Sequence, residues 1–203
     1  MDIRPIRRVV TGHDAQGHAV VVMDGPAANV LHRPDRPRVA LTDLWATSQK
    51  PAARMDGDPV DRPVVLHPPP AGTVFRIIQF DPEDPGALAH ADGTAAFAAM
   101  GAAGTVVAGA RHPYMHRTDT VDYAVVLQGS ITMLLDEEDV ELSAGDVVIQ
   151  NGTNHAWANR GHTPCLMAFV LIDAPSDPPP GGAAISPPRA AVQSWPSPGN
   201  AGT

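Results

Sequence analysis

Two short blocks of the chain gather most of the side chains that could do chemistry. The first block is residues 116–123, with the sequence HRTDTVDY, and the second is residues 145–159, GDVVIQNGTNHAWAN. Between them they supply imidazole, carboxylate, hydroxyl and indole groups. Imidazole and carboxylate groups bind divalent transition metals, and they also line polar ligand pockets. The two blocks therefore indicate either a metal centre or a polar binding site.

Short apolar runs surround both blocks and must position them. Residues 121–127 alternate between apolar and polar or small side chains in the manner of a strand, and Gly129 ends that run. Further short runs follow at residues 131–135, 140–142, 147–149 and 166–172, with Gly, Asp or Asn turns between them. Many short strands at regular spacing favour an all-β fold, an antiparallel sandwich or barrel.

The rest of the chain divides unevenly. Residues 1–80 contain four expected β segments, at 8–10, 19–23, 38–45 and 73–80, and we interpret them as N-terminal strands and loops that pack on a barrel. Residues 81–173 form the expected barrel core, with a short helix near 94–100. Residues 174–203 are rich in Pro and Gly and predict a disordered tail.

Composition limits the classes of protein that the chain can belong to. The 203 residues fit one domain with additions, and 18 Gly and 22 Pro suit a turn-rich β protein. A formal net charge of −8 argues against nucleic acid and anionic membranes as partners. No secretory signal or membrane span is evident, so we expect a cytoplasmic protein. The single cysteine, Cys165, is expected to be a buried small hydrophobe.

The two blocks resemble the two halves of the cupin signature. In that family the first half carries two histidines and a glutamate before a glycine, and the second carries a histidine followed by an asparagine. Anchored on Gly129, the alignment puts His116 at the first histidine position and Asp122 at the glutamate position. His155 and Asn159 keep the spacing of the second half. The resemblance implies a double-stranded β-helix, the cupin or jelly-roll barrel, with a pocket inside it.

The resemblance also implies a ligand set with gaps. His116, Asp122 and His155 would hold a divalent metal (Fe, Mn, Ni, Cu or Zn), and two histidines with one carboxylate suit iron(II), zinc or manganese. Thr118 stands where the family has its second histidine. Asp is one methylene shorter than Glu, so its carboxylate reaches roughly 1.5 Å less far. The alternative is a cupin without metal, in which these three side chains line a polar pocket.

Five residues are further candidates for the same site. His112 is a possible fourth ligand if its loop folds inward, although its place beside Pro113 favours a solvent-exposed loop histidine. Thr118 and Tyr123 could assist catalysis, but Tyr123 follows Asp122 on a strand and should face the opposite side. Trp157 and Asn159 are expected at the pocket, where Trp157 could stack on a planar substrate or be a buried structural residue.

The runs HRTDTVDY and GDVVIQNGTNHAW look like a subgroup of stand-alone, single-domain cupins of the conserved-barrel (cupin_2) type. Some members are called cupin-domain oxidoreductases. The resemblance implies a metal-dependent enzyme, an oxidoreductase or isomerase, that oxidises, isomerises or cyclises a small oxygenated organic substrate. The alternatives are a metal-free ligand-binding module and a regulatory cupin that acts through a partner. Because an open sandwich leaves strand edges to cover, we also expect a homodimer.

Overall fold

The structure is a computed structural model that describes residues 3–13, 19–33, 35–36, 38–49, 52–54 and 57–174. The expected disordered tail therefore lies outside the described residues from 175 onward. Within the described part, eleven strands are present: β1 (Arg7–His13), β2 (Ala19–Pro26), β3 (Val30–His32), β4 (Ala40–Thr47), β5 (Thr73–Phe80), β6 (Thr120–Gln128), β7 (Ser130–Leu134), β8 (Asp139–Ser143), β9 (Val147–Asn151), β10 (Ala156–Ala158) and β11 (Cys165–Asp173).

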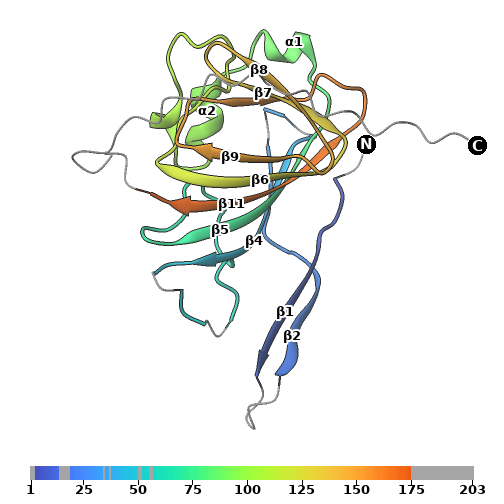
Figure 1. Cartoon of the computed structure of the whole chain (residues 1–203), viewed down its shortest axis with the longest axis vertical. Helices are drawn as coiled ribbons and strands as arrows, with labels where there is room; N and C mark the ends of the chain where they lie inside the picture. The colour runs from blue at the N-terminus through green and yellow to red at the C-terminus, as the bar shows by residue number, and fades with distance from the viewer. Residues whose placement is uncertain are drawn as a thin grey trace, which may run out of the picture.

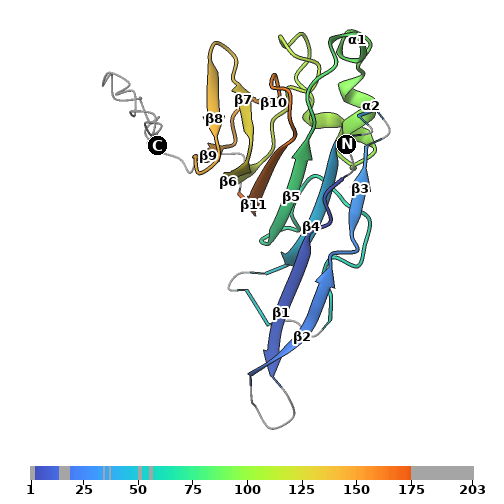
Figure 2. The same cartoon turned by 90° about the vertical axis from the view of Figure 1, so that its right-hand side faces the viewer.

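Two antiparallel sheets build the barrel, and a two-stranded hairpin extends from it. Six strands form one sheet in the order β3-β4-β5-β11-β6-β9, and three form the other in the order β10-β7-β8. The β1–β2 hairpin projects away from the barrel in both views (Figures 1 and 2). The all-β fold expected from the many short strands is confirmed.

Strand alternation explains the inward-facing side chains. Along β6, Asp122, Ala124 and Val126 are buried, whereas Tyr123 between them is exposed. The same alternation on β11 turns Cys165 into the core, where it is fully buried as expected and burial raises its thiol pKa to about 11. The main apolar cluster includes buried residues of both sheets, so the core lies between them.

The expected boundary at residue 80 does not separate two layers. Strands β4 and β5 lie before it, yet they belong to the same sheet as β11, β6 and β9. β5 pairs with β11 over eight residue pairs, which makes the N-terminal strands part of the barrel wall rather than a layer packed on it. Only the β1–β2 hairpin stands apart as an addition.

Two short helices lie at one end of the barrel (Figure 2). They are α1 (Pro85–Leu88) and α2 (Gly93–Ala98), followed by a 3₁₀ turn η1 (Ala103–Thr105). Asp92 caps α2 by accepting a hydrogen bond from the Ala95 amide at 3.0 Å. Gly93 is required there, because a Cβ atom would lie 1.9 Å from the Pro113 carbonyl oxygen. This close approach brings Phe97 of α2 to the site described next.

Candidate functional site

A cavity of about 80 Å³ lies between the two sheets. The structure places four of the sequence-predicted site residues on its wall: His116, Asp122, His155 and Trp157. Asp122 is on β6, Trp157 is on β10, and the two histidines form an isolated bridge beside β10. Residues outside the two sequence blocks complete the wall, among them Arg33, Arg36, Arg76, Phe97 and Tyr114.

His116 and His155 are held side by side by their own backbones. The His116 amide donates to the His155 carbonyl at 2.9 Å, and the His155 amide donates to the His116 carbonyl at 3.0 Å. The ring centroids of the two histidines are 4.4 Å apart. The ring of Phe97, which is on α2, also has its centroid 4.4 Å from that of His116. The pair is therefore fixed in position before any ligand binds.

The His116 ring is a neutral acceptor toward the cavity. Its Nδ1 lies 3.1 Å from the Tyr114 carbonyl oxygen, which can only accept, so Nδ1 carries the proton and Nε2 is left unprotonated. Burial and the neighbouring His155 lower the pKa of His116 to about 3. At neutral pH this imidazole is uncharged.

The His155 ring has two satisfied arrangements. Its Nδ1 lies 3.0 Å from the Thr153 carbonyl oxygen and 2.9 Å from the Gln150 side-chain nitrogen. The Gly152 amide donates to Oε1 of Gln150 at 3.0 Å, which fixes Nε2 of Gln150 as the donor facing His155. Nδ1 either donates to Thr153 or accepts from Gln150, and in the second case Nε2 carries the proton. Burial lowers the pKa of His155, which favours the neutral ring.

Asp122 is the acidic group of the cavity wall. Its side chain is buried, and Oδ1 has no hydrogen-bond partner among the described residues. Burial raises the pKa of this carboxyl to about 6, although a hydrogen bond from Thr120 and the charge of Arg76 oppose the shift. An unpartnered buried carboxyl whose pKa lies near neutrality is a common feature of functional sites.

The residues as placed do not fit a resident metal. Among the described residues, no group of three His, Cys, Asp or Glu side chains is arranged to hold a metal ion. Thr118, at the family's second histidine position, is buried, and its hydroxyl is 2.8 Å from that of Thr120. The metal set of His116, Asp122 and His155 stays a prediction, and no chemical step below depends on it.

Two candidates from the sequence do not face the cavity. Tyr123 is 47% exposed on the outer face of the sheet, so the expectation that it assists catalysis is corrected by the alternation of β6. Asn159 is fully buried, and its amide donates to the Phe80 and Thr163 carbonyl oxygens, each at 2.8 Å. Asn159 therefore connects the end of β5 to the loop before β11 instead of lining the pocket.

His112 is buried, which corrects the expectation of a solvent-exposed loop histidine. Its Nε2 lies 3.3 Å from Glu83, and its Nδ1 accepts from the Tyr114 amide at 3.2 Å. Both ring nitrogens are thus engaged outside the cavity, so the side chain as placed is not a fourth ligand. The partner Glu83 lies 29 residues upstream, and nothing in the local sequence around His112 indicates it.

Sequence reasoning missed the arginines of the cavity wall. Arg33 and Arg36 come from a loop between β3 and β4, about 80 residues before His116 in the chain. The stretch RPDRPR at residues 33–38 is basic and rich in proline, which marks a loop but not where the loop packs.

Among the described residues, no helix is long and apolar enough to cross a membrane.

The fold and the cavity define a small β-barrel protein with an internal ligand pocket. Residues 104–172 match the family model of the cupin domain (Cupin_2). The chain belongs to the cupin superfamily, as the resemblance of its two motifs implied.

Similar proteins include a biosynthesis cluster protein, a cupin-domain oxidoreductase and a conserved barrel domain protein. The chain is 32% identical over 184 residues to the Phomopsin biosynthesis cluster protein C' of Diaporthe leptostromiformis, which covers 85% of this chain and 81% of the relative. It is 27% identical to the cupin-domain-containing oxidoreductase fogC of Aspergillus ruber, over 82% of this chain and 71% of the relative. Among solved structures, a Cupin 2 conserved barrel domain protein from Salinispora arenicola matches 86% of this chain and 90% of its own, with 15% identity and a TM-score of 0.40.

Proposed function

We propose that this cupin is an enzyme that moves a proton on a small oxygenated organic substrate held in the barrel cavity, so that the substrate isomerises or cyclises. The observation that carries the proposal is Asp122, a buried carboxyl with an unpartnered oxygen beside two neutral histidines. Similarity to fungal biosynthesis cluster proteins and cupin-domain oxidoreductases supports a role as an enzyme of small-molecule metabolism.

In the proposed reaction Asp122 is the general base. Above about pH 6 the carboxylate takes a proton from a carbon next to the substrate carbonyl. The electron pair of the broken C–H bond forms a C=C bond, and the π pair of the carbonyl moves onto its oxygen to give an enolate. In an isomerisation of a hydroxy-carbonyl group, Asp122 returns the proton to the former carbonyl carbon while the hydroxyl proton passes to the other oxygen. In a cyclisation the enolate carbon attacks a second carbonyl of the substrate, whose π bond opens, and the resulting alkoxide takes the proton from Asp122. No oxidant is needed, since the substrate is only rearranged.

The histidine pair would orient the substrate and stabilise the enolate. With Nδ1 of His155 accepting from Gln150, its Nε2–H is a donor toward the enolate oxygen. His116 has the opposite tautomer, so its Nε2 accepts a hydrogen bond from a substrate hydroxyl. In that tautomer of His155 the two rings offer one donor and one acceptor, with ring centroids 4.4 Å apart, and this pair would suit a hydroxy-carbonyl group.

The test follows deuterium uptake from D₂O by NMR, because proton abstraction exchanges hydrogen even when no net product forms. Suitable probes are 2-oxobutanoate and its uncharged counterpart 1-hydroxybutan-2-one, observed at carbon 3. We expect exchange to exceed the protein-free rate by about tenfold or more, to rise as pH passes about 6, and to vanish in Asp122→Asn. Asp119→Asn, at an exposed carboxylate in the same block, is the matched control. Exchange that persists in Asp122→Asn refutes the proposal.

A metal-dependent mechanism is the competing prediction, and elemental analysis separates the two. The protein is purified without chelators beside His116→Ala and His155→Ala. We expect far less than one Fe, Mn, Ni, Cu or Zn per chain, because the ligand set is incomplete. About one equivalent in the wild type, lost in both variants, would replace proton transfer by Asp122 with metal chemistry.

A further inference from the structure

Three arginines line the inner cavity, and two of them donate hydrogen bonds to neighbouring residues. Arg76 donates to Asp43 at 2.5 Å and to the carbonyl oxygens of Val65 and Leu66. Arg33 pairs with both carboxylate oxygens of Asp35, at 3.0 and 2.5 Å. A carboxylate therefore accepts hydrogen bonds from each of these two guanidinium groups.

Arg36 differs from both. Its side chain is only 13% exposed, yet its guanidinium donates no hydrogen bond to any of the described residues. The nearest carboxylate is Glu83, whose Oε1 lies 3.5 Å away and also contacts His112 at 3.3 Å. Burial lowers the pKa of Arg36, an effect that the charge of Glu83 only partly offsets. Glu83 is thus the ion-pair partner of Arg36, but no described residue accepts a hydrogen bond from the guanidinium, so its N–H donors are open.

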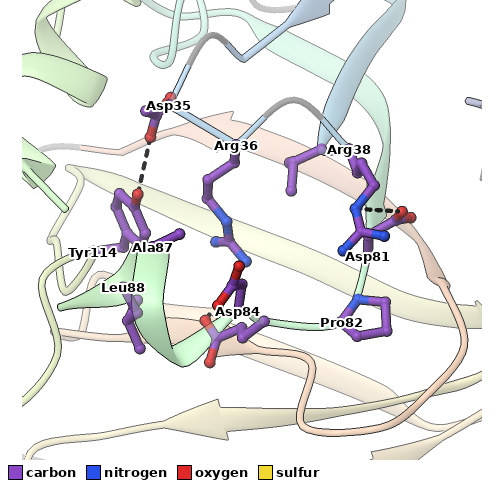
Figure 3. A pocket seen from close by; sticks show the side chains of 11 residues that line it. Asp35, Arg36, Arg38, Asp81, Pro82, Asp84, Ala87, Leu88 and Tyr114 are labelled. Carbon is purple, nitrogen blue, oxygen red and sulfur yellow. Dashed lines mark hydrogen bonds and ion pairs between the residues drawn. The ribbon is translucent and has the colours of Figure 1, made fainter. Parts of the chain in front are cut away.

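The position of Arg36 links two cavities. A second cavity of about 150 Å³ lies outside the first, and Arg36, Val39 and Tyr114 line both. Figure 3 shows the Arg36 side chain extending into this outer cavity from the loop that also carries Asp35 and Arg38. The carbon Cζ of Arg36 is 5.0 Å from the centroid of the Tyr114 ring, so the ring supports the guanidinium in place. The open donors therefore lie on the wall between the outer cavity and Asp122.

We propose that the substrate of this enzyme carries a carboxylate, and that Arg36 binds it at the wall shared by the two cavities. This inference rests on the proposed function. The planar fork of a guanidinium matches a carboxylate with two parallel hydrogen bonds. Arg33 and Arg76 donate hydrogen bonds to Asp35 and Asp43, so Arg36 is the arginine of the inner cavity wall whose N–H donors are open to a carboxylate.

The arrangement also assigns the two ends of the substrate. An inner cavity of about 80 Å³ holds only a few non-hydrogen atoms, which suits the reacting carbons beside Asp122 and the histidines. The carboxylate would remain at Arg36, where the outer cavity gives it room. The substrate class is then a small oxo- or hydroxy-acid.

The test measures dissociation constants by NMR titration of the full chain. The probes are 2-oxobutanoate, its uncharged counterpart 1-hydroxybutan-2-one, and inorganic phosphate. We compare the wild type with Arg36→Gln, which removes the charge, and Arg36→Lys, which keeps the charge but not the fork. Arg38→Gln is the matched control, because Arg38 is 55% exposed and lines only the outer cavity.

We expect 2-oxobutanoate to bind about tenfold or more weaker to Arg36→Gln, with Arg36→Lys between that variant and the wild type, and Arg38→Gln unchanged. Binding of 1-hydroxybutan-2-one should not depend on Arg36. Equal affinity of 2-oxobutanoate for the wild type and Arg36→Gln overturns the inference. So does the absence of saturable binding of 2-oxobutanoate to the wild type, or tighter binding of phosphate than of the carboxylate.

The same samples separate this inference from the proposed function. Asp122→Asn should bind 2-oxobutanoate at least as well as the wild type while losing deuterium exchange. Arg36→Gln should raise the KM for exchange and leave the rate at saturation much closer to that of the wild type. Arg36-dependent binding without exchange would leave the inference standing and remove the proposed reaction. Deuterium exchange whose KM is the same in the wild type and in Arg36→Gln would leave the proposed reaction standing and remove the inference about Arg36.

Discussion

Asp122 and Tyr123 are adjacent on β6 and lie in opposite environments. Asp122 is 6% exposed and faces a cavity lined by two histidines and three arginines, whereas Tyr123 is 47% exposed on the outer face of the same sheet. On that outer face Tyr123 pairs across the ladder with Ile149 of β9, which is 59% exposed. The sheet thus buries ionisable groups on one side and exposes apolar groups on the other.

Apolar side chains are usually buried and ionisable ones exposed, and each face of this sheet departs from that rule. The two departures indicate different roles. Burial of imidazoles and a carboxyl without full partners lowers stability and is a common feature of functional sites, which is consistent with the reaction proposed above. An exposed apolar patch on a sheet is the usual mark of a surface that another molecule covers. The following predictions test the two faces separately, beginning with the largest expected effect.

Arg76 and Asp43 form the structural ion pair of the inner face, and both are almost completely buried. Arg76→Met should lower the free energy of unfolding by about 3–5 kcal/mol, because it leaves the Asp43 carboxylate buried without its partner. Urea denaturation at pH 7 measures the change. The matched control is Arg7→Met, since Arg7 pairs with Asp24 at the exposed surface, and it should leave the unfolding midpoint unchanged. Equal effects of the two substitutions would contradict the assignment.

His116 should make the protein sensitive to acid. Its pKa is about 3 in the folded state against an ordinary 6.5, so its contribution to stability is present above pH 6.5 and is lost as pH falls toward 3. Between pH 7 and pH 4.5 this loss is about 3 kcal/mol. His116→Gln should flatten that part of the stability curve, measured by urea denaturation at several pH values. If His116→Gln loses as much unfolding free energy between pH 7 and pH 4.5 as the wild type does, groups other than His116 cause that loss.

Asp122 should act in the opposite direction. Its folded-state pKa is about 6 against an ordinary 3.8, so its stabilising protonation is complete below pH 3.8 and is lost as pH rises through 6. Asp122→Asn cannot ionise, and above pH 7 it should be more stable than the wild type by about 1–2 kcal/mol, less than the full shift because the amide is still buried. The gain should disappear near pH 4. A variant less stable than the wild type at pH 8 would contradict the raised pKa.

Much of the barrel could be predicted from local pattern, because inside and outside alternate along each strand. The alternation in residues 121–127 and the apolar run 166–172 gave β6 and β11 to within a residue or two at each end. The three-residue strands β3 and β10 were missed. The sequence of β10, Ala-Trp-Ala, has no β-branched residue, and it is a strand only because β7 pairs with it.

Only part of the candidate site could be predicted from the sequence, because some of its residues come together only through tertiary packing. His116, Asp122 and His155 lie in two compact motifs, and the resemblance of these motifs to the cupin signature implied that the three side chains converge. Arg36 comes from a distant loop and reaches the cavity only through tertiary packing. His112 was expected at the surface because Pro113 follows it, but Glu83 supplies a partner that lets the ring be buried. Burial of a polar side chain depends on its partner, and local sequence does not name that partner.

The outer face gives the smallest effect on the stability of a single chain and tests the predicted homodimer. Phe75, Val170, Tyr123 and Ile149 lie in register across β5, β11, β6 and β9, and Val147 beside them is 60% exposed. We propose that this patch packs against a second copy of the chain. Ile149→Lys should then convert a dimer to a monomer, because a lysine ammonium would be buried in the interface. Light scattering after size-exclusion chromatography measures the mass.

The matched control is Val65→Lys, at a 36% exposed apolar residue in a loop away from the patch, which should remain dimeric. Both substitutions should change the unfolding free energy of the chain itself by less than about 0.5 kcal/mol, since neither side chain is in the core. A wild type that elutes as a monomer would remove the dimer. In that case the exposed apolar side chains of β5, β6 and β9 would not bind a second copy of the chain. The two faces of the sheet would then differ in the kind of side chain they carry, without the outer face forming a dimer interface.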